Sequence, residues 1–162
     1  MENSYPDFST LINEKPSAVA RVKGSAIYPK IQGDVWFYQT YYGVLVVADI
    51  ENLPISADKC KSPIFAFHIH EGGSCTGNSQ DLFANVGTHY NPNNCMHPYH
   101  AGDLPPLFGA NGYAFSVVLT NRFNVEEIIG RSVVIHSSFD DFVSQPAGNS
   151  GMKIACGVIE KL

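Results

Sequence analysis

The decisive stretch of the sequence is Phe65-Ala66-Phe67-His68-Ile69-His70, in which large apolar residues alternate with small or polar ones. Such alternation is typical of a half-buried β-strand. Because side chains two positions apart on a strand project from the same face, His68 and His70 point together, opposite Phe67 and Ile69. The stretch therefore predicts a strand with one face toward a core and two imidazoles on the other.

Further segments have the same strand character, with β-branched and aromatic residues bounded by turn residues. They are residues 18–22, 35–39, 44–48, 113–119, 132–136 and 153–159. A helix is expected only over residues 124–129, where Asn124 can act as the N-cap. This pattern predicts an all-β fold, an antiparallel β-sandwich or barrel.

Composition agrees with a fold of short strands and excludes several classes of protein. The chain has 162 residues, the length of one domain, and only 15% of them are charged, against roughly 25% in average globular proteins. With a net charge of −5, it lacks the basic character of a nucleic-acid-binding protein. The sequence contains no run of about 18 consecutive apolar residues, the length that a membrane-spanning helix needs. We expect a single domain over residues 1–162, with neither a nucleic-acid partner nor a membrane partner.

The N-terminus and the cysteines bear on the compartment. Residues 1–16 form a polar tail that lacks the positive and apolar regions of a signal peptide, so the chain is expected in the cytoplasm, or outside it if a leader has been removed. Four cysteines allow three full pairings, among which spacing does not choose. They are Cys60, Cys75, Cys95 and Cys156. Disulfides are uncommon in reducing compartments.

A long stretch without periodicity separates two of the predicted strands. Residues 71–110 are rich in Gly, Asn, Pro and His, and they far exceed the roughly 4–6 residues of an ordinary connection. Such a loop is either disordered or functional, and a bound metal could order it.

All six histidines fall on this loop or at strand positions. Three histidines and one aspartate lie within residues 89–103, and this donor set can close a tetrahedral zinc cage. They are His89, His97, His100 and Asp103. The alternative interpretation is a polar surface loop whose histidines cluster without a metal. His68, His70 and His136 supply three more imidazoles from strands, a donor type that favours copper first and iron or nickel second.

Four stretches resemble the copper–zinc superoxide dismutase family, in the family's order and at near-family spacing. They are residues 67–71 (FHIHE), 87–92 (GTHYNP), 100–104 (HAGDL) and 148–159 (GNSGMKIACGVI). The resemblance implies a Greek-key antiparallel β-sandwich or flattened barrel of about eight strands with long metal-binding loops. It also implies an enzyme that disproportionates superoxide anion to dioxygen and hydrogen peroxide by Cu(II)/Cu(I) cycling beside a structural zinc ion.

The resemblance also assigns site residues by position. It implies the copper ligands His68, His70, His89 and His136, and the zinc ligands His89, His97, His100 and Asp103. His89 would then bridge both metals as an imidazolate and take part in catalysis. Asp140 stands where the family has an aspartate that links a copper ligand to a zinc ligand. Cys75 and Cys156 stand where the family has its disulfide.

The chain departs from the animal enzymes near the expected copper site, which makes it similar to bacterial members. The family usually has an arginine three residues before the final cysteine, whereas this chain has Lys153, which is expected to attract the anion. Lysine keeps the charge but lacks the planar fork of arginine. The loop between His136 and Lys153 is shorter, and Ala147 stands where the animal enzymes have a threonine.

Two other functions are compatible with these residues. A dismutase-like module could bind copper for storage or delivery with little activity. A zinc hydrolase could use an open position at the strand histidines, but it needs a carboxylate base. Glu71 is the nearest in sequence, and it would face away along the strand.

The sequence leaves the assembly and two cysteines open. Cys60 and Cys95 could form a second bridge or remain as thiols. A homodimer is expected as one arrangement, for which the aromatic runs at residues 36–38 and 41–42 offer contact surface if they are exposed.

Overall fold

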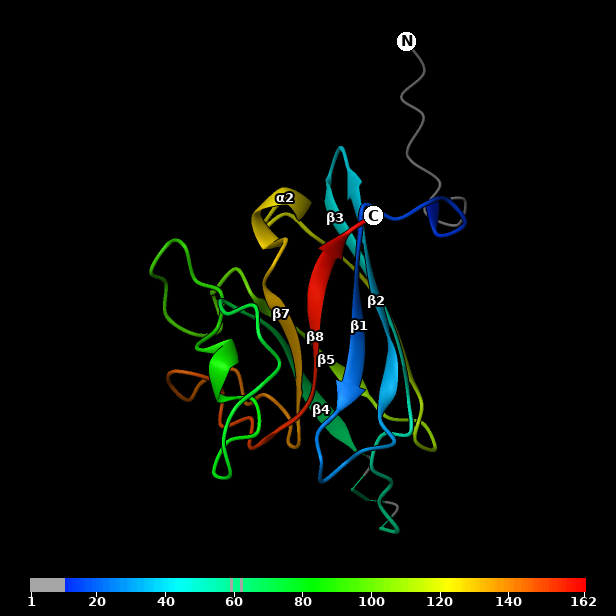
Figure 1. Ribbon diagram of the computed structural model, residues 1–162, viewed down its shortest axis with the longest axis vertical. Coiled ribbons are helices and arrows are strands. Elements are labelled where there is room, and N and C mark those ends of the chain that lie inside the picture. The colour runs from blue at the N-terminus through cyan, green and yellow to red at the C-terminus, as the bar shows by residue number, and fades with distance from the viewer. Residues whose placement is uncertain (1–10, 59, 62) are drawn as a thin grey trace.

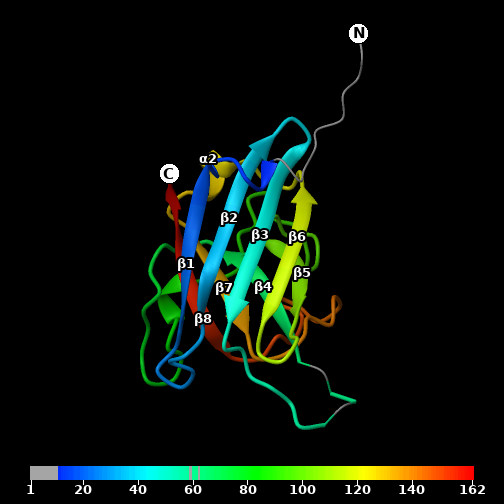
Figure 2. The ribbon, with the colours of Figure 1, turned by 90° about the vertical axis from the view of Figure 1, so that its right-hand side faces the viewer.

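The structure is a computed structural model that describes residues 11–58, 60–61 and 63–162. Eight strands form one antiparallel sheet in the order β5-β4-β7-β8-β1-β2-β3-β6 (Figures 1 and 2). Their bounds are β1 Ala18–Gly24, β2 Gln32–Thr40, β3 Gly43–Glu51, β4 Ile64–His70, β5 Asp103–Phe108, β6 Ala114–Thr120, β7 Ser132–His136 and β8 Lys153–Lys161. Strands β5 and β6, at the two ends of this order, lie side by side and nearly close a barrel (Figure 2).

Two strand pairs carry the Greek-key signature of neighbours three apart along the chain. Strand β6 pairs with β3, and β7 pairs with β4. The expected all-β Greek-key barrel is therefore confirmed. The predicted helix is present as α2 (Val125–Ile128), in which the backbone N–H of Asn124 donates to the Glu127 carboxylate at 2.6 Å. A short 3₁₀ turn, η1 (Ala84–Val86), lies on the long loop after β4.

Strand β5 corrects the prediction that residues 71–110 form a loop throughout. It begins at Asp103 and contains Pro105 and Pro106, two residues that argue against a central strand. Both prolines fall where the pairing with β4 shifts register, between the Phe65–Leu107 and Phe67–Leu104 pairs. Strand β5 also bonds to one neighbour only, so an absent proline N–H leaves no gap in a ladder.

The alternation along β4 divides its side chains between two environments. Phe65, Phe67 and Ile69 belong to the main core inside the barrel. His68 and His70 lie on the outer face, yet both are buried, because loop residues 71–102 and 137–152 cover that face (Figure 1). A second apolar cluster beneath the first of these loops joins Phe83, Val86, Val134 and Cys156.

The aromatic run at residues 36–38 does not form an exposed surface. Phe37 lies in the core, and Tyr38 is buried on the outer face, where Leu11 and Ile12 pack beside it. Of the two other residues considered for a contact surface, Tyr41 is 94% exposed and Tyr42 48%. Residues 1–10 of the expected polar tail lie outside the described residues; Leu11 and Ile12 contact the barrel.

Within the described residues, no helix has the length and apolar character needed to cross a bilayer.

Candidate metal centre

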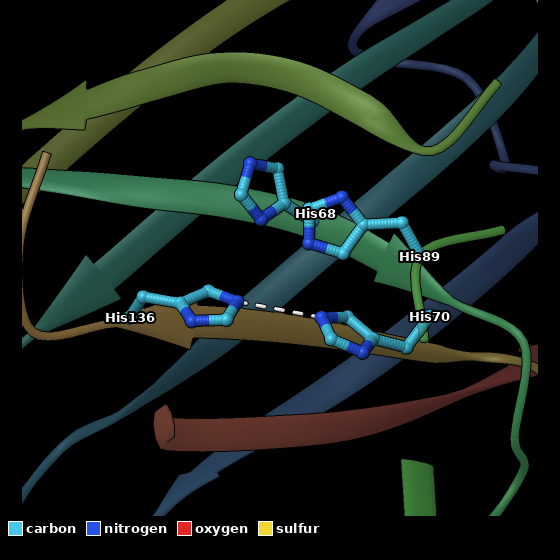
Figure 3. A group of neighbouring side chains, drawn as sticks. All are labelled: His68, His70, His89 and His136. Atoms are coloured by element: carbon cyan, nitrogen blue, oxygen red, sulfur yellow. Dashed lines mark hydrogen bonds between the residues drawn. The ribbon is translucent and has the colours of Figure 1, made fainter. Parts of the chain in front are cut away.

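Four imidazoles meet on the outer face of the barrel. His68 and His70 come from β4 and His136 from the end of β7, while His89 reaches them from the long loop through an isolated bridge to His70. All four side chains are buried, and their ligand atoms lie within 4.8 Å of one another. Figure 3 shows the four rings facing one another.

Several nitrogens of this histidine group lie close together, and some of them have no hydrogen-bond partner among the described residues. His70 Nε2 and His136 Nε2 face each other at 3.3 Å (Figure 3). His68 Nδ1 and His89 Nε2 are buried, and no described residue gives them a hydrogen bond. Buried nitrogens without partners are costly unless another group satisfies them. A metal ion among them would accept these lone pairs.

Burial keeps three of these histidines, His68, His70 and His136, uncharged. It lowers the pKa of His136 to about 3, with repulsion from His68 and His89 adding to the effect. Burial also holds the pKa of His70 well below its usual value and lowers that of His68. These imidazoles are neutral near pH 7, the form that ligates copper or zinc.

A second group is centred on the Asp103 carboxylate. Its Oδ1 lies 2.7 Å from His89 Nδ1, and its Oδ2 lies 3.0 Å from His97 Nδ1 and 3.2 Å from His100 Nδ1. Burial alone would raise the pKa of Asp103, but the hydrogen bond with His89 and the neighbouring imidazoles lower it. Three imidazoles around one carboxylate form the tetrahedral donor set that zinc prefers. His89 belongs to both groups, with Nδ1 toward Asp103 and Nε2 free for the other.

Asp140 joins the two groups. Its Oδ2 contacts His68 Nε2 at 2.8 Å, and its Oδ1 contacts His97 Nε2 at 2.8 Å. Burial would raise the pKa of Asp140, but hydrogen bonds from His68, the Phe142 amide and His97 lower it to about 2. An ionised carboxylate in this position orients both rings and leaves their other nitrogens free for ligation.

Gly148 makes this carboxylate bridge possible, a role that no motif in the sequence predicts. A Cβ atom at position 148 would lie 2.0 Å from Asp140 Oδ1 and 2.7 Å from His97 Nε2. The residue also has φ +67°, a conformation that favours glycine. The sequence shows that a glycine is present here, but it does not show which atoms a side chain at this position would clash with.

A cavity of about 400 Å³ opens onto the histidine group. His70, His89 and His136 line it together with Lys153 and Ala147. Glu71, the base considered for a hydrolase, is not part of this lining; its carboxylate accepts a hydrogen bond from Thr88 Oγ1 at 3.1 Å.

The ammonium group of Lys153 has an unexpected partner. Its Nζ lies 2.5 Å from Asp81 Oδ2, and the lysine side chain is only 17% exposed. Burial would raise the pKa of Asp81, but hydrogen bonds from Lys153 and the Phe83 amide lower it, so the carboxylate is ionised near pH 7. Lys153 therefore stands at the cavity as one half of an ion pair. Asp81 lies 72 residues away, and no sequence signal links the two.

A disulfide ties the loop before η1 to the barrel. Cys75 and Cys156 are bonded, with their Cα atoms 5.7 Å apart. This bond attaches the loop that carries Asp81 to β8, the strand that begins with Lys153. The pairing implied by the family resemblance is confirmed. Cys60 and Cys95 are free and exposed, so the second bridge considered from the sequence is not formed.

We expect Cys75→Ser to destabilise the fold, because the bond closes a loop of 81 residues. The chain-entropy model gives a loss on the order of 4 kcal/mol in the free energy of unfolding for such a loop. Urea unfolding of Cys75→Ser, with Cys60→Ser as the matched control, measures it. Equal midpoints for the two variants would show that the bond does not contribute to stability.

Comparison with known proteins agrees with this geometry. A profile of the copper/zinc superoxide dismutase family matches residues 31–159, most of the chain. The chain belongs to this family. The identification predicted from four short motifs is thereby confirmed.

Individual copper–zinc superoxide dismutases match over most of their length. The Cu-Zn superoxide dismutase of Photobacterium leiognathi is 34% identical over 142 residues, which cover 79% of this chain and 78% of the relative. That of Legionella pneumophila is 35% identical over 140 residues, covering 82% and 80%. The solved structure of the Cu/Zn superoxide dismutase from Brucella abortus has a TM-score of 0.74 to this chain at 27% identity. That match covers 88% of this chain and 99% of the solved one.

Proposed function

We propose that this chain is a superoxide dismutase, with copper held by His68, His70, His89 and His136. Zinc would be held by His89 together with the residues around Asp103. The observation that carries the proposal is the position of His89, one imidazole shared by two buried groups of four donors. A copper ion in the first group would supply a one-electron couple that oxidises one superoxide to dioxygen and reduces a second to peroxide.

The reaction needs protons as well as electrons, since two superoxide anions and two protons give dioxygen and hydrogen peroxide. His89 is placed to hold one of these protons. Its Nδ1 is held 2.7 Å from Asp103, while its Nε2 faces the histidine group without a partner. His89 is one of the residues that line the cavity, so a proton held on its ring lies close to the place where a small anion would enter.

Lys153 would attract the anion to this cavity. The protein carries a net charge of −5, which repels superoxide at long range. A cationic side chain on the cavity wall can offset this repulsion locally, because a cleft focuses the field of the charges that line it. The pairing with Asp81 reduces the charge that Lys153 presents to the cavity.

We expect His136→Ala to separate the two groups experimentally, because His136 belongs to the histidine group alone. The variant should lose copper, retain zinc and lose catalysis of superoxide decay. Metal content by mass spectrometry and superoxide decay by pulse radiolysis measure these effects.

Two outcomes would contradict the proposal. A wild-type protein that is fully loaded with copper and zinc but does not accelerate superoxide decay would favour the module for copper storage or delivery. A His136→Ala protein with unchanged copper content and rate would contradict the ligand assignment.

We also propose a single domain over residues 1–162 that acts as a homodimer. The exposed apolar side chains of Phe115, Val117 and Leu119 on β6 support a contact between copies. Analytical ultracentrifugation tests the homodimer. The cytoplasmic location stays a prediction, for which cell fractionation is the test.

A further inference from the structure

We propose that Arg122 and Gln145 are positioning residues for the zinc group, the donor set centred on the Asp103 carboxylate. They would hold the backbone of residues 97–103 in its metal-binding conformation before the metal arrives. We call these two side chains the backbone clamp. The inference rests on the proposed zinc assignment, because three of the four residues in that group, His97, His100 and Asp103, lie in this segment.

Arg122 holds the segment from Pro98 to Asp103. It lies in the turn between β6 and α2, far from the segment in sequence. Its Nη1 donates to the backbone carbonyls of Pro98 at 3.1 Å, His100 at 3.2 Å and Asp103 at 2.9 Å. The three carbonyl oxygens carry partial negative charges and would repel one another at this distance. The positively charged guanidinium between them offsets that repulsion and stabilises this backbone conformation.

Gln145 holds the N-terminal end of the segment. Its side-chain Nε2 donates to the His97 carbonyl at 2.7 Å, and its Oε1 accepts from the His97 amide at 3.0 Å. The same loop carries Asp140, whose Oδ1 contacts His97 Nε2. This loop therefore fixes both the backbone and the ring of one zinc-group histidine.

The segment needs such support because it has little regular structure of its own. Residues 91–102 form turns without a strand or helix, and β5 begins only at Asp103. A loose segment would lose conformational entropy on binding metal, which lowers affinity. Three members of the histidine group, which would bind copper and is called the copper group below, lie on β4 and β7 and are held by the pairing of these strands. The clamp should therefore affect zinc and leave copper unchanged.

The test compares clamp variants with matched controls. Arg122→Gln and Gln145→Met remove the clamp bonds. Arg21→Gln and Gln32→Met make the same exchanges at exposed positions whose partners are Glu160 and Glu51. Zinc affinity of the metal-free proteins is measured by competition with a chromophoric chelator. We expect each clamp variant to bind zinc about 10- to 100-fold more weakly, the usual effect of removing groups that orient metal ligands. Controls and copper affinity should not change.

Two further measurements separate positioning from general stability. Amide hydrogen exchange in residues 97–103 of the metal-free protein should be faster in the clamp variants, with β4 and β7 unchanged. Arg122→Lys should restore much of the zinc affinity. The three clamp bonds leave from one nitrogen, whose two N–H groups are shared among three carbonyls, and an ammonium has three N–H donors for the same carbonyls.

Specific outcomes would overturn the clamp. Unchanged zinc affinity and unchanged exchange in both variants would do so, as would an equal loss of copper affinity or an equal effect in the controls. Failure of the proposed function looks different: the wild-type protein would take up no zinc, or Asp103→Ala would bind it normally. The exchange measurement on metal-free protein would then still test the clamp.

Discussion

Asp103→Ala is expected to abolish tight zinc binding and to lower the melting temperature of the zinc-loaded protein by about 10 °C. A ligand present at about 1,000 times its Kd stabilises a protein by roughly 4 kcal/mol, and each kcal/mol shifts the melting temperature of a domain this size by about 2–4 °C. Asp103 is the residue to change because its carboxylate contacts His89, His97 and His100.

The measurement is differential scanning calorimetry of wild type and Asp103→Ala, each with zinc and with a chelator. Asp58→Ala, which removes an exposed carboxylate in the connection between β3 and β4, is the matched control. The zinc-dependent rise should vanish in Asp103→Ala and persist in Asp58→Ala. Identical melting of zinc-loaded and chelated wild type would contradict a structural role for zinc.

Copper is expected to stabilise the protein less than zinc does. Three of the four copper-group residues lie on β4 and β7, which pair with each other over Phe67–Ile135 to His70–Ser132. The zinc group instead takes three residues from the segment that ends where β5 begins. Metal binding contributes most to folding where the protein alone orders the ligands least.

The sequence was informative wherever structure depends on local pattern. Alternation predicted β4 with its two faces, and the histidine-rich segment predicted a donor set that the structure brings together around Asp103. Strand β5 was missed because two consecutive prolines, Pro105 and Pro106, are typical of a loop. Their presence is explained by the register shift in the pairing with β4 and by the position of β5 at the end of the strand order.

The remaining features depend on long-range approach. The partners of Lys153 and of the His97 backbone come from loops 72 and 48 residues away in the chain, which only the three-dimensional fold brings close. Surface aspartate and glutamine residues are common, so nothing in the sequence distinguishes Asp81 or Gln145 from their neighbours. Similarly, the sequence leaves open whether the aromatic run at residues 36–38 is exposed or buried, and only the fold places Phe37 in the core.

Lys153→Glu and Asp81→Asn are expected to change the superoxide rate in opposite directions. Lys153→Glu removes the cation from the cavity wall and places a second carboxylate beside Asp81, so both charges repel the anion. Focusing in clefts changes association rates by about 10- to 1,000-fold, a general range that superoxide dismutases themselves help to define. We expect a decrease of about tenfold or more and a rate that rises with added salt, because salt screens the repulsion over roughly 8–10 Å.

Asp81→Asn keeps the shape of the partner and removes its charge, which leaves the Lys153 ammonium uncompensated at the cavity. The rate should be higher than in wild type, and it should fall more steeply as salt is added. Lys153→Arg should hold or raise the rate, since a guanidinium can bind a small anion through two hydrogen bonds. Lys161→Glu reverses a charge at an exposed site paired with Glu126 and is the matched control. Superoxide decay by pulse radiolysis at several ionic strengths, on proteins with equal copper and zinc content, measures all four variants. If Asp81→Asn slows the reaction as Lys153→Glu does, then the ion pair itself, rather than the free charge of Lys153, is what the enzyme needs at this cavity.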